Sequence, residues 1–174
     1  MRSTDHLALL SVHGNRHCWT GLCWLCDFAA AVRTFDVDCE RLLESAAERG
    51  GERMLLVGCE LADRLLGVEP PAAVERRRVS GDAVDGLASR VEERFLWADR
   101  RDELKALRYG FAVRERRRDR ARRVARLALL PNRNDLAVLP ESLRSYPLAV
   151  AARPFRVATE AGQLLAERVA ARQS

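Results

Sequence analysis

The sequence is short of lysine and lacks long apolar runs. All of its 30 basic residues except Lys105 are arginine. No apolar run approaches the ~20 residues that a membrane-spanning helix requires. The Leu7–Leu10 run follows Asp5 and His6 and is too short for the apolar core of a signal peptide. We therefore expect a cytoplasmic protein, in which the five cysteines are free thiols.

Common catalytic motifs are also missing. All three histidines fall before residue 18, so no Ser-His-Asp arrangement can be read from the chain, and Gly-x-Ser-x-Gly does not occur. No glycine-rich loop that could cradle phosphates is present. Asp36-Val37-Asp38 has the spacing of a paired acidic motif, but it follows a predicted helix and is better interpreted as a helix cap.

What remains is the composition of a globular helical protein. The 174 residues are 48% hydrophobic and 32% charged, enough for one domain with a substantial core. The net charge of +5 permits a polyanionic partner without requiring one. We predict a single helical domain over residues 1–174, with its core in residues 4–130 and a proline-broken extension with a last helix in 131–174.

Apolar spacing predicts an all-α fold, an irregular bundle of about six to eight helices, because no β-type alternation persists. Gly14 is expected to end or bend the first helix. The clearest helix runs from Glu52 to Leu66, where Gly58 predicts the close approach of a neighbouring helix. Residues 69–81 are expected to form an exposed connection, and one long helix is expected from about Glu103 to Leu129. A last amphipathic helix is expected from about Val157 to Ala171.

One stretch concentrates the chemically active side chains. His13, Arg16 and His17 precede a helix whose only charged residue between Gly21 and Val32 is Asp27. Because apolar side chains point all round this helix, we expect it to be buried on most sides. A buried carboxylate needs a partner, and Arg16 and Arg53 offer one. The sequence thus predicts a polar cluster of His13, Arg16, His17, Asp27 and Arg53, either buried or facing a bound nucleotide.

Two metal-binding interpretations of this stretch are weaker. His13 and His17 have the spacing of two ligands on one helix, with Asp27 as a third, but Gly14 argues against an unbroken helix. Cys18, Cys23 and Cys26 follow C-x4-C-x2-C, a spacing found in iron–sulfur proteins. Cluster ligands usually lie on open loops, so we expect neither a metal nor an iron–sulfur cofactor.

A second charged stretch runs from Arg114 to Arg126. It could contact the phosphates of a nucleic acid, although no aromatic residue lies among its arginines to stack on bases. A solvated helix face with internal ion pairs is the simpler interpretation. The candidate polyanion-binding residues are Arg114, Arg116, Arg117, Arg118, Arg120, Arg122 and Arg123.

Taken in order, several motifs resemble one family. They are Val12-His13-Gly14-x-Arg16-His17-x-Trp19, Leu22-Cys23-Trp24-Leu25-Cys26-Asp27, Glu52 to Gly58, Leu61-Ala62 with Leu65-Leu66-Gly67, Leu130-Pro131-x-x-x-Asp135, Leu139-Pro140, and Tyr146 followed by Arg153-Pro154-x-Arg156. The chain resembles the C-terminal helical part of the bacterial uncharacterised nucleotidyltransferase family, relatives of the polymerase-beta-type nucleotidyltransferases.

The resemblance implies a catalytic domain that this sequence does not contain. In the family, a Gly-Ser turn and paired acidic residues would bind Mg²⁺ and a nucleoside triphosphate; neither motif occurs here. We therefore expect this chain to bind no cofactor by itself. The chain would be a truncated member of the family, a fragment or a stand-alone helical module. It would pack against a nucleotidyltransferase domain or partner chain. A nucleic-acid-binding module and a helical scaffold remain the alternatives, and enzymatic activity stays undecided.

Overall fold

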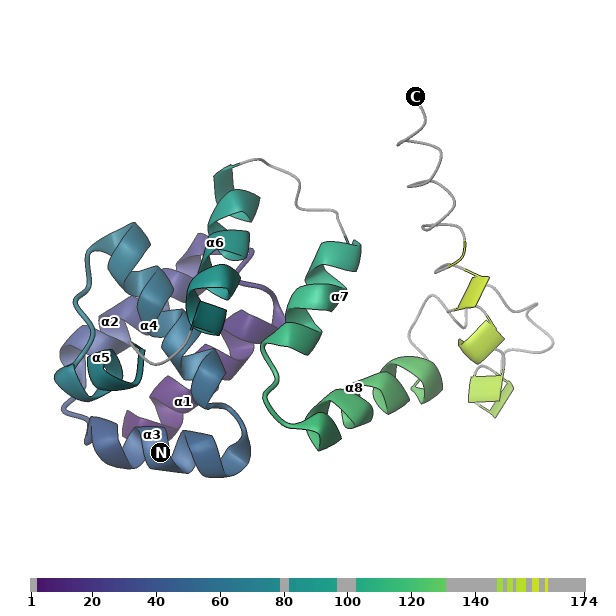
Figure 1. The fold of residues 1–174 in the computed structure, drawn as a ribbon, viewed down its shortest axis with the longest axis horizontal. Coiled ribbons are helices and arrows are strands. Elements are labelled where there is room, and N and C mark those ends of the chain that lie inside the picture. Colours follow the sequence, from purple (N-terminus) through teal and green to yellow (C-terminus); the bar gives the residue numbers. More distant parts are fainter. Residues whose placement is uncertain are drawn as a thin grey trace. The chain divides into compact units, whose positions relative to one another are not determined.

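The computed structural model describes residues 3–78, 82–96 and 103–130, and, further on, residues 147, 148, 150, 151, 153–155, 158, 159 and 162. The described residues form helices joined by short connections, with no strand among them, as the sequence predicts. The chain divides into two compact units, Met1–Asp119 and Arg120–Ser174. The helices labelled in Figure 1 are α1 Ser3–Arg16, α2 Leu22–Thr34, α3 Cys39–Arg49, α4 Glu52–Leu66, α5 Ala72–Arg78, α6 Asp82–Leu96, α7 Glu103–Ala112 and α8 Arg117–Leu129.

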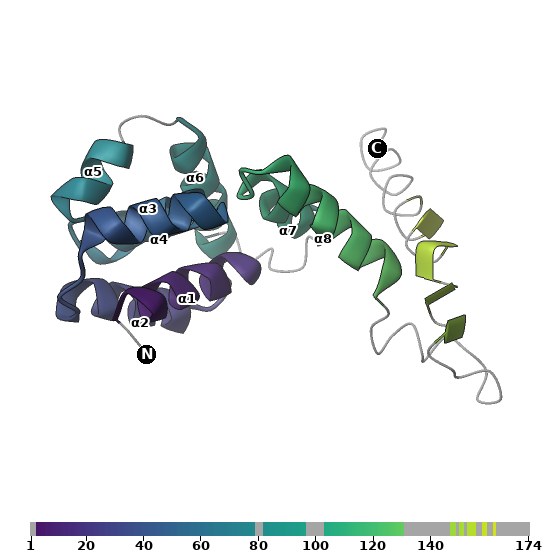
Figure 2. The same cartoon turned by 90° about the horizontal axis from the view of Figure 1, so that it is seen from below.

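Helix α4 is the central element of the first unit. Every residue from Met54 to Ala62 is buried, and the helix packs against α1, α2, α3, α5 and α6. Figure 2 shows α1 and α2 on one side of α4, and α5 and α6 on the other. Burial on all sides explains why apolar residues dominate this helix. Gly67 ends it at a φ of 63°, a conformation that favours glycine.

Helix α2 packs on α4, as predicted at Gly58, and what reaches the glycine is a side chain of α2 and one of the turn before it. A Cβ at Gly58 would lie 3.0 Å from the Phe28 ring and 3.2 Å from the Trp19 ring. These two rings meet edge to face, with centroids 5.6 Å apart. Both are fully buried, so the glycine makes room for an aromatic pair in the core.

Caps at both ends of α3 follow from the sequence. The Asp38 side chain accepts a hydrogen bond of 3.1 Å from the backbone N–H of Arg41, which satisfies one of the free donors at the helix start. Gly50 ends the helix at a φ of 73°. The interpretation of Asp38 as a helix cap is therefore confirmed.

An ion-pair network joins α4 to α5 and α6. Glu60 is buried and pairs with Arg64 and with Arg78, the latter at 2.9 Å. Arg78 also pairs with Asp63 at 2.8 Å, and Arg64 with Asp85 of α6 at 3.0 Å. The network compensates the burial of the Glu60 carboxylate, which would be costly alone.

Three predicted boundaries are wrong. Helix α1 continues through Gly14 to Arg16, because Gly14 is needed for packing and not as a stop. The predicted connection at residues 69–81 contains α5, whose arginines find carboxylate partners. The predicted long helix is two helices, α7 and α8, separated at residues 113–116.

The second unit is described through α8, which begins just before it, and a few later positions. Arg153 is buried and donates a 2.6 Å hydrogen bond from Nε to the Leu127 carbonyl. The expected last helix, the Pro131-to-Asp135 turn, Leu139-Pro140, Tyr146 and Arg156 lie outside the described residues.

Candidate functional site

Exposed rings gather where α1 meets α2. His13 and His17 have ring centroids 4.8 Å apart. Trp24 of α2 lies 5.2 Å from His13 and 4.8 Å from His17. Both histidines and Arg16 are exposed, and Trp24 is half-buried. We call these four residues, with the exposed apolar side chains of Leu9, Val12 and Leu22, the α1–α2 face.

A tight turn after α1 produces this face. The backbone N–H of Trp19 donates to the Gly14 carbonyl at 2.8 Å, and that of Cys18 donates to the Asn15 carbonyl at 3.1 Å. This is the pattern of a Schellman motif. Cys18 and Trp19 both have φ of 51°, which is unfavourable for residues with a Cβ. The Trp19 ring folds back onto Gly14, where any added Cβ would overlap it.

A buried polar network does exist, but it lies at Asn15. The Asn15 side-chain amide donates to the Ser11 and Met54 carbonyls at 2.8 Å each. Its oxygen accepts a 2.6 Å hydrogen bond from the Tyr109 hydroxyl of α7. Every polar group of the Asn15 amide is therefore used to hold α1, α4 and α7 together.

The prediction of a buried network around Asp27 is wrong. Asp27, His13, Arg16 and His17 are exposed. Helix α2 is buried along one side only, through Leu25, Phe28, Ala29 and Ala31. Cys23, Cys26 and Asp27 lie on its solvent side, where the carboxylate needs no partner. That these residues face a nucleotide stays a prediction.

Arg53 has a structural role away from the histidines. Its guanidinium donates from Nη1 to the Ala112 carbonyl at 2.9 Å, and its backbone N–H donates to Glu115 at 3.1 Å. Ala112 is the last residue of α7, so Arg53 places a positive charge at a helix C-terminus. Arg53 therefore anchors α4 to the end of α7.

The two halves of the arginine-rich stretch differ. Arg114 donates to the Gly110 carbonyl, and Arg116 donates to Ala47 at 2.6 Å. These two arginines bind carbonyls in the last turns of α7 and α3. Arg117, Arg118, Arg120 and Arg122 are exposed, and Arg123 is half-buried. The exposed members are the ones that could meet a polyanion.

Possible metal ligands do not come together in the described residues, where no group of three His, Cys, Asp or Glu side chains is placed to hold an ion. The five cysteines are free thiols. Cys18 is buried, whereas Cys23 and Cys26 are exposed. Cys18 therefore points away from the two others of its sequence motif.

The pKa of His17 is lowered by partial burial and, in addition, by the neighbouring charges of His13 and Arg16. Positively charged groups that lie close together oppose each other's protonation. The lowered pKa favours the neutral imidazole of His17, which can both accept and donate a hydrogen bond.

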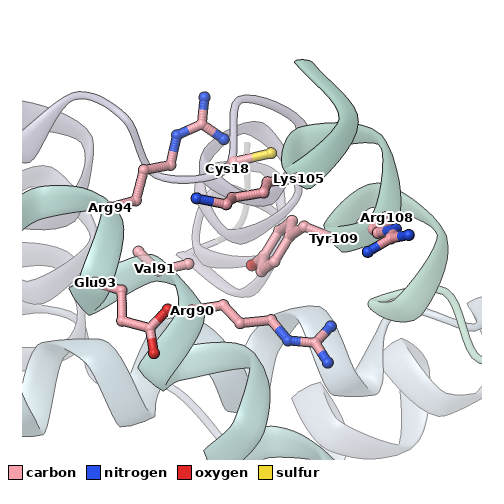
Figure 3. A pocket seen from close by; sticks show the side chains of 8 residues that line it. All are labelled: Cys18, Arg90, Val91, Glu93, Arg94, Lys105, Arg108 and Tyr109. Atoms are coloured by element: carbon pink, nitrogen blue, oxygen red, sulfur yellow. The ribbon is translucent and has the colours of Figure 1, made fainter. Parts of the chain in front are cut away.

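A basic cavity of about 730 Å³ lies between α6 and α7. Cationic side chains surround it: Arg90 and Arg94 from α6, and Lys105 and Arg108 from α7. Tyr109, Val91 and Cys18 form its buried wall. Figure 3 shows Lys105 extending from α7 towards α6, and Arg90 extending from α6 towards α7.

Sequence reasoning missed this cavity. The only signal was local: Arg90 and Arg94 are four residues apart and Lys105 and Arg108 three apart, so each pair shares one side of its helix. That the two sides face each other depends on how α6 and α7 pack, which no local pattern reveals.

Part of the chain is similar to a known protein family. The model of a family described as an uncharacterised nucleotidyltransferase matches residues 1–67. This segment contains α1 to α4 and the α1–α2 face, whereas the basic cavity is built mainly by helices beyond it. No curated protein and no solved structure matches the chain. The similarity is therefore to a nucleotidyltransferase family, over the N-terminal part of the chain.

None of the helices in the described part of the chain is both long and apolar enough to cross a bilayer.

Proposed function

We propose that this chain is the helical part of a nucleotidyltransferase-type protein or assembly, and that its α1–α2 face packs against the nucleotide-binding domain. The observation that carries the proposal is the exposed cluster of His13, His17 and Trp24 inside the segment that matches the nucleotidyltransferase family. Its role is binding and not transfer chemistry, because the sequence has no Gly-Ser turn followed by paired acidic residues.

The chemistry of the face suits such an interface. Leu9, Val12 and Leu22 expose 57%, 45% and 51% of their surfaces. Leu9 and Val12 each lie one helical turn before His13 and Arg16 on α1, and Leu22 is the first residue of α2. Interfaces combine aromatic and arginine anchors with apolar surroundings in this way. Under the proposal Arg16, His13 and His17 line the shared surface and contact the nucleotide, its Mg²⁺-bound phosphates or the domain that holds them.

Photo-crosslinking in the native cells tests this proposal. A photoreactive amino acid replaces Val12 or Leu22, and mass spectrometry identifies the crosslinked peptide. We expect a peptide from a domain with a Gly-Ser turn and paired acidic residues, whether that domain belongs to the same polypeptide or to another. The matched control is Glu44, an exposed residue of α3. Crosslinks to a second copy of this chain, or equal yields from Glu44, would contradict the proposal.

Alanine substitutions at His13, Arg16 and His17 provide a second test. Because these side chains are exposed, the domain should keep its free energy of unfolding within about 0.5 kcal/mol. Nucleotide binding by the complete assembly should weaken. Unchanged nucleotide binding and unchanged assembly in all three variants would argue against a shared face.

The exposed arginines of α8 favour a second function, nucleic-acid binding. Arg117, Arg118, Arg120 and Arg122 present cations to solvent, and such binding would weaken steeply with salt. Replacing these four residues with glutamine should abolish it. Salt-independent self-association of the chain would instead favour a helical scaffold.

A further inference from the structure

The basic cavity between α6 and α7 has the dimensions of a small-molecule site. Its volume of about 730 Å³ lies within the ~300–1,000 Å³ typical of ligand pockets. Val91 and Tyr109 are 2% and 3% exposed, so the wall is firmly packed. The Tyr109 hydroxyl donates to Asn15 at 2.6 Å, which fixes the ring drawn between Lys105 and Arg90 in the view of Figure 3.

Two cations of this cavity, Arg90 and Arg108, differ from the arginines that hold the helices of the first unit together. Arg64, Arg76, Arg77 and Arg78 each pair with a carboxylate, and Arg53 and Arg116 bind carbonyls. Within the part of the chain that the structure describes, Arg90 and Arg108 make neither an ion pair nor a hydrogen bond. Glu93 is the only carboxylate among the described residues that line the cavity.

Cations gathered around a concave surface raise its electrostatic potential and attract anions. Arginine suits phosphate in particular, because its planar fork donates two parallel hydrogen bonds to two oxygens. Cations reaching in from two helices can hold an anion from opposite sides. The neutral Tyr109 ring and Val91 would contact the less polar part of such a ligand, since burial raises the pKa of Tyr109.

We propose that this cavity binds a small organic compound with a di- or triphosphate group, and that Arg90 and Arg108 contact the phosphates. The site is distinct from the α1–α2 face and does not depend on the function proposed for that face. It also lies mainly on helices outside the segment that matches the nucleotidyltransferase family.

Titration calorimetry on the full chain tests the proposal, with pyrophosphate and ATP as probes and sulfate at equal ionic strength as the reference anion. We expect saturable binding of both probes with one site per chain. Arg90→Gln and Arg108→Gln should each weaken it about tenfold, the effect of one charge-assisted hydrogen bond. Arg90→Lys should give an intermediate affinity, because it keeps the charge and loses the fork.

The control variant is Arg76→Gln. Arg76 is an exposed arginine paired with Glu40, and its replacement changes the net charge equally. Equal weakening in Arg76→Gln and Arg108→Gln would show a general charge effect and overturn the proposal. Absence of binding by the wild-type chain, or no discrimination between pyrophosphate and sulfate, would overturn it as well.

A single-stranded oligonucleotide distinguishes a small ligand from a nucleic acid. If the oligonucleotide binds at least tenfold more tightly than ATP and still depends on Arg90 and Arg108, the cavity belongs to a nucleic-acid surface, and the proposal of a small phosphate compound is wrong. Crosslinking at Val12 is unaffected by either result, so failure here is separable from failure of the function proposed for the α1–α2 face.

Discussion

The two sides of α6 use charge in opposite ways. Asp85, Ser89 and Glu92 face α4 and contact Arg64. Arg90 and Arg94 face α7 and, with Lys105 and Arg108, surround a cavity. The first side neutralises charge around the buried Glu60, and the second collects positive charge. One side therefore contributes to folding, and the other is suited to binding an anion.

The largest loss of stability should come from the side of α6 that forms ion pairs with α4. Glu60→Gln removes a buried carboxylate that compensates Arg64 and Arg78. Loss of one partner from a buried pair costs roughly 3–5 kcal/mol, and we expect about 2–3 kcal/mol because both arginines are partly exposed and keep other partners. Urea unfolding measures the loss. The control is Glu44→Gln at an exposed position of α3, and an equal, small effect of both variants would refute a stabilising network.

Alkaline pH should destabilise the fold through two buried acidic groups, the Cys59 thiol of α4 and the Tyr109 hydroxyl at the cavity wall. Burial raises the pKa of Cys59, beside Glu60, from 9.0 to about 12, and burial also raises the pKa of Tyr109 above 10.0. Each folded-state pKa exceeds its unfolded value, so the unfolded chain releases protons first. Stability is complete below pH 9 and falls above it, by up to about 1.4 kcal/mol per pH unit for each group.

Unfolding series from pH 8 to 11 check this behaviour. Cys59→Ala should remove the loss that begins near pH 9, and Tyr109→Phe the loss that begins near pH 10. Stability that stays constant to pH 11 would mean that neither group is buried as described.

Two glycines should respond with opposite sign. In Gly14→Ala the new Cβ overlaps the Trp19 ring, so overpacking should cost about 1–2 kcal/mol despite the better helix propensity. Gly86 is exposed on α6, and a Cβ added there would have no neighbour within 4 Å. Gly86→Ala should therefore stabilise the fold by about 0.5–1 kcal/mol. Thermal unfolding of the two variants gives both signs, and stabilisation by Gly14→Ala would contradict the packing of Trp19.

The smallest effect on stability should come from the cavity. The Arg90→Gln/Arg108→Gln double variant should unfold within about 0.5 kcal/mol of the wild type, because neither arginine holds a described partner. Urea unfolding of this variant beside Glu60→Gln provides the direct contrast. Comparable losses of unfolding free energy in the two variants would contradict the distinction between the two sides of α6.

Local signals in the sequence were enough for the helices with clear ends. The bounds of α4 follow from Gly51, Gly67 and the apolar spacing between them. The cap at Asp38 and the stop at Gly50 are likewise readable. These bounds can be predicted because caps and glycine conformations act within a few residues of where they lie.

Contacts between distant residues account for the failures. Helix α2 has apolar residues on every side, and only the packing of α1 and α4 decides that Asp27 faces solvent. Arg116 reaches the carbonyl of Ala47, far away in the sequence. Asn15 acquires its role from Met54 and Tyr109. None of these partners can be found from helical spacing.

The central claim is that the cavity side of α6 binds phosphate, and the dependence of unfolding on pyrophosphate tests it most directly. A ligand that binds only the folded chain raises the free energy of unfolding as its concentration exceeds the Kd. We predict that pyrophosphate stabilises the wild type and Arg76→Gln, relative to sulfate at equal ionic strength, and leaves Arg90→Gln/Arg108→Gln unchanged. The same stabilisation in the double variant, or none in the wild type, would contradict the claim.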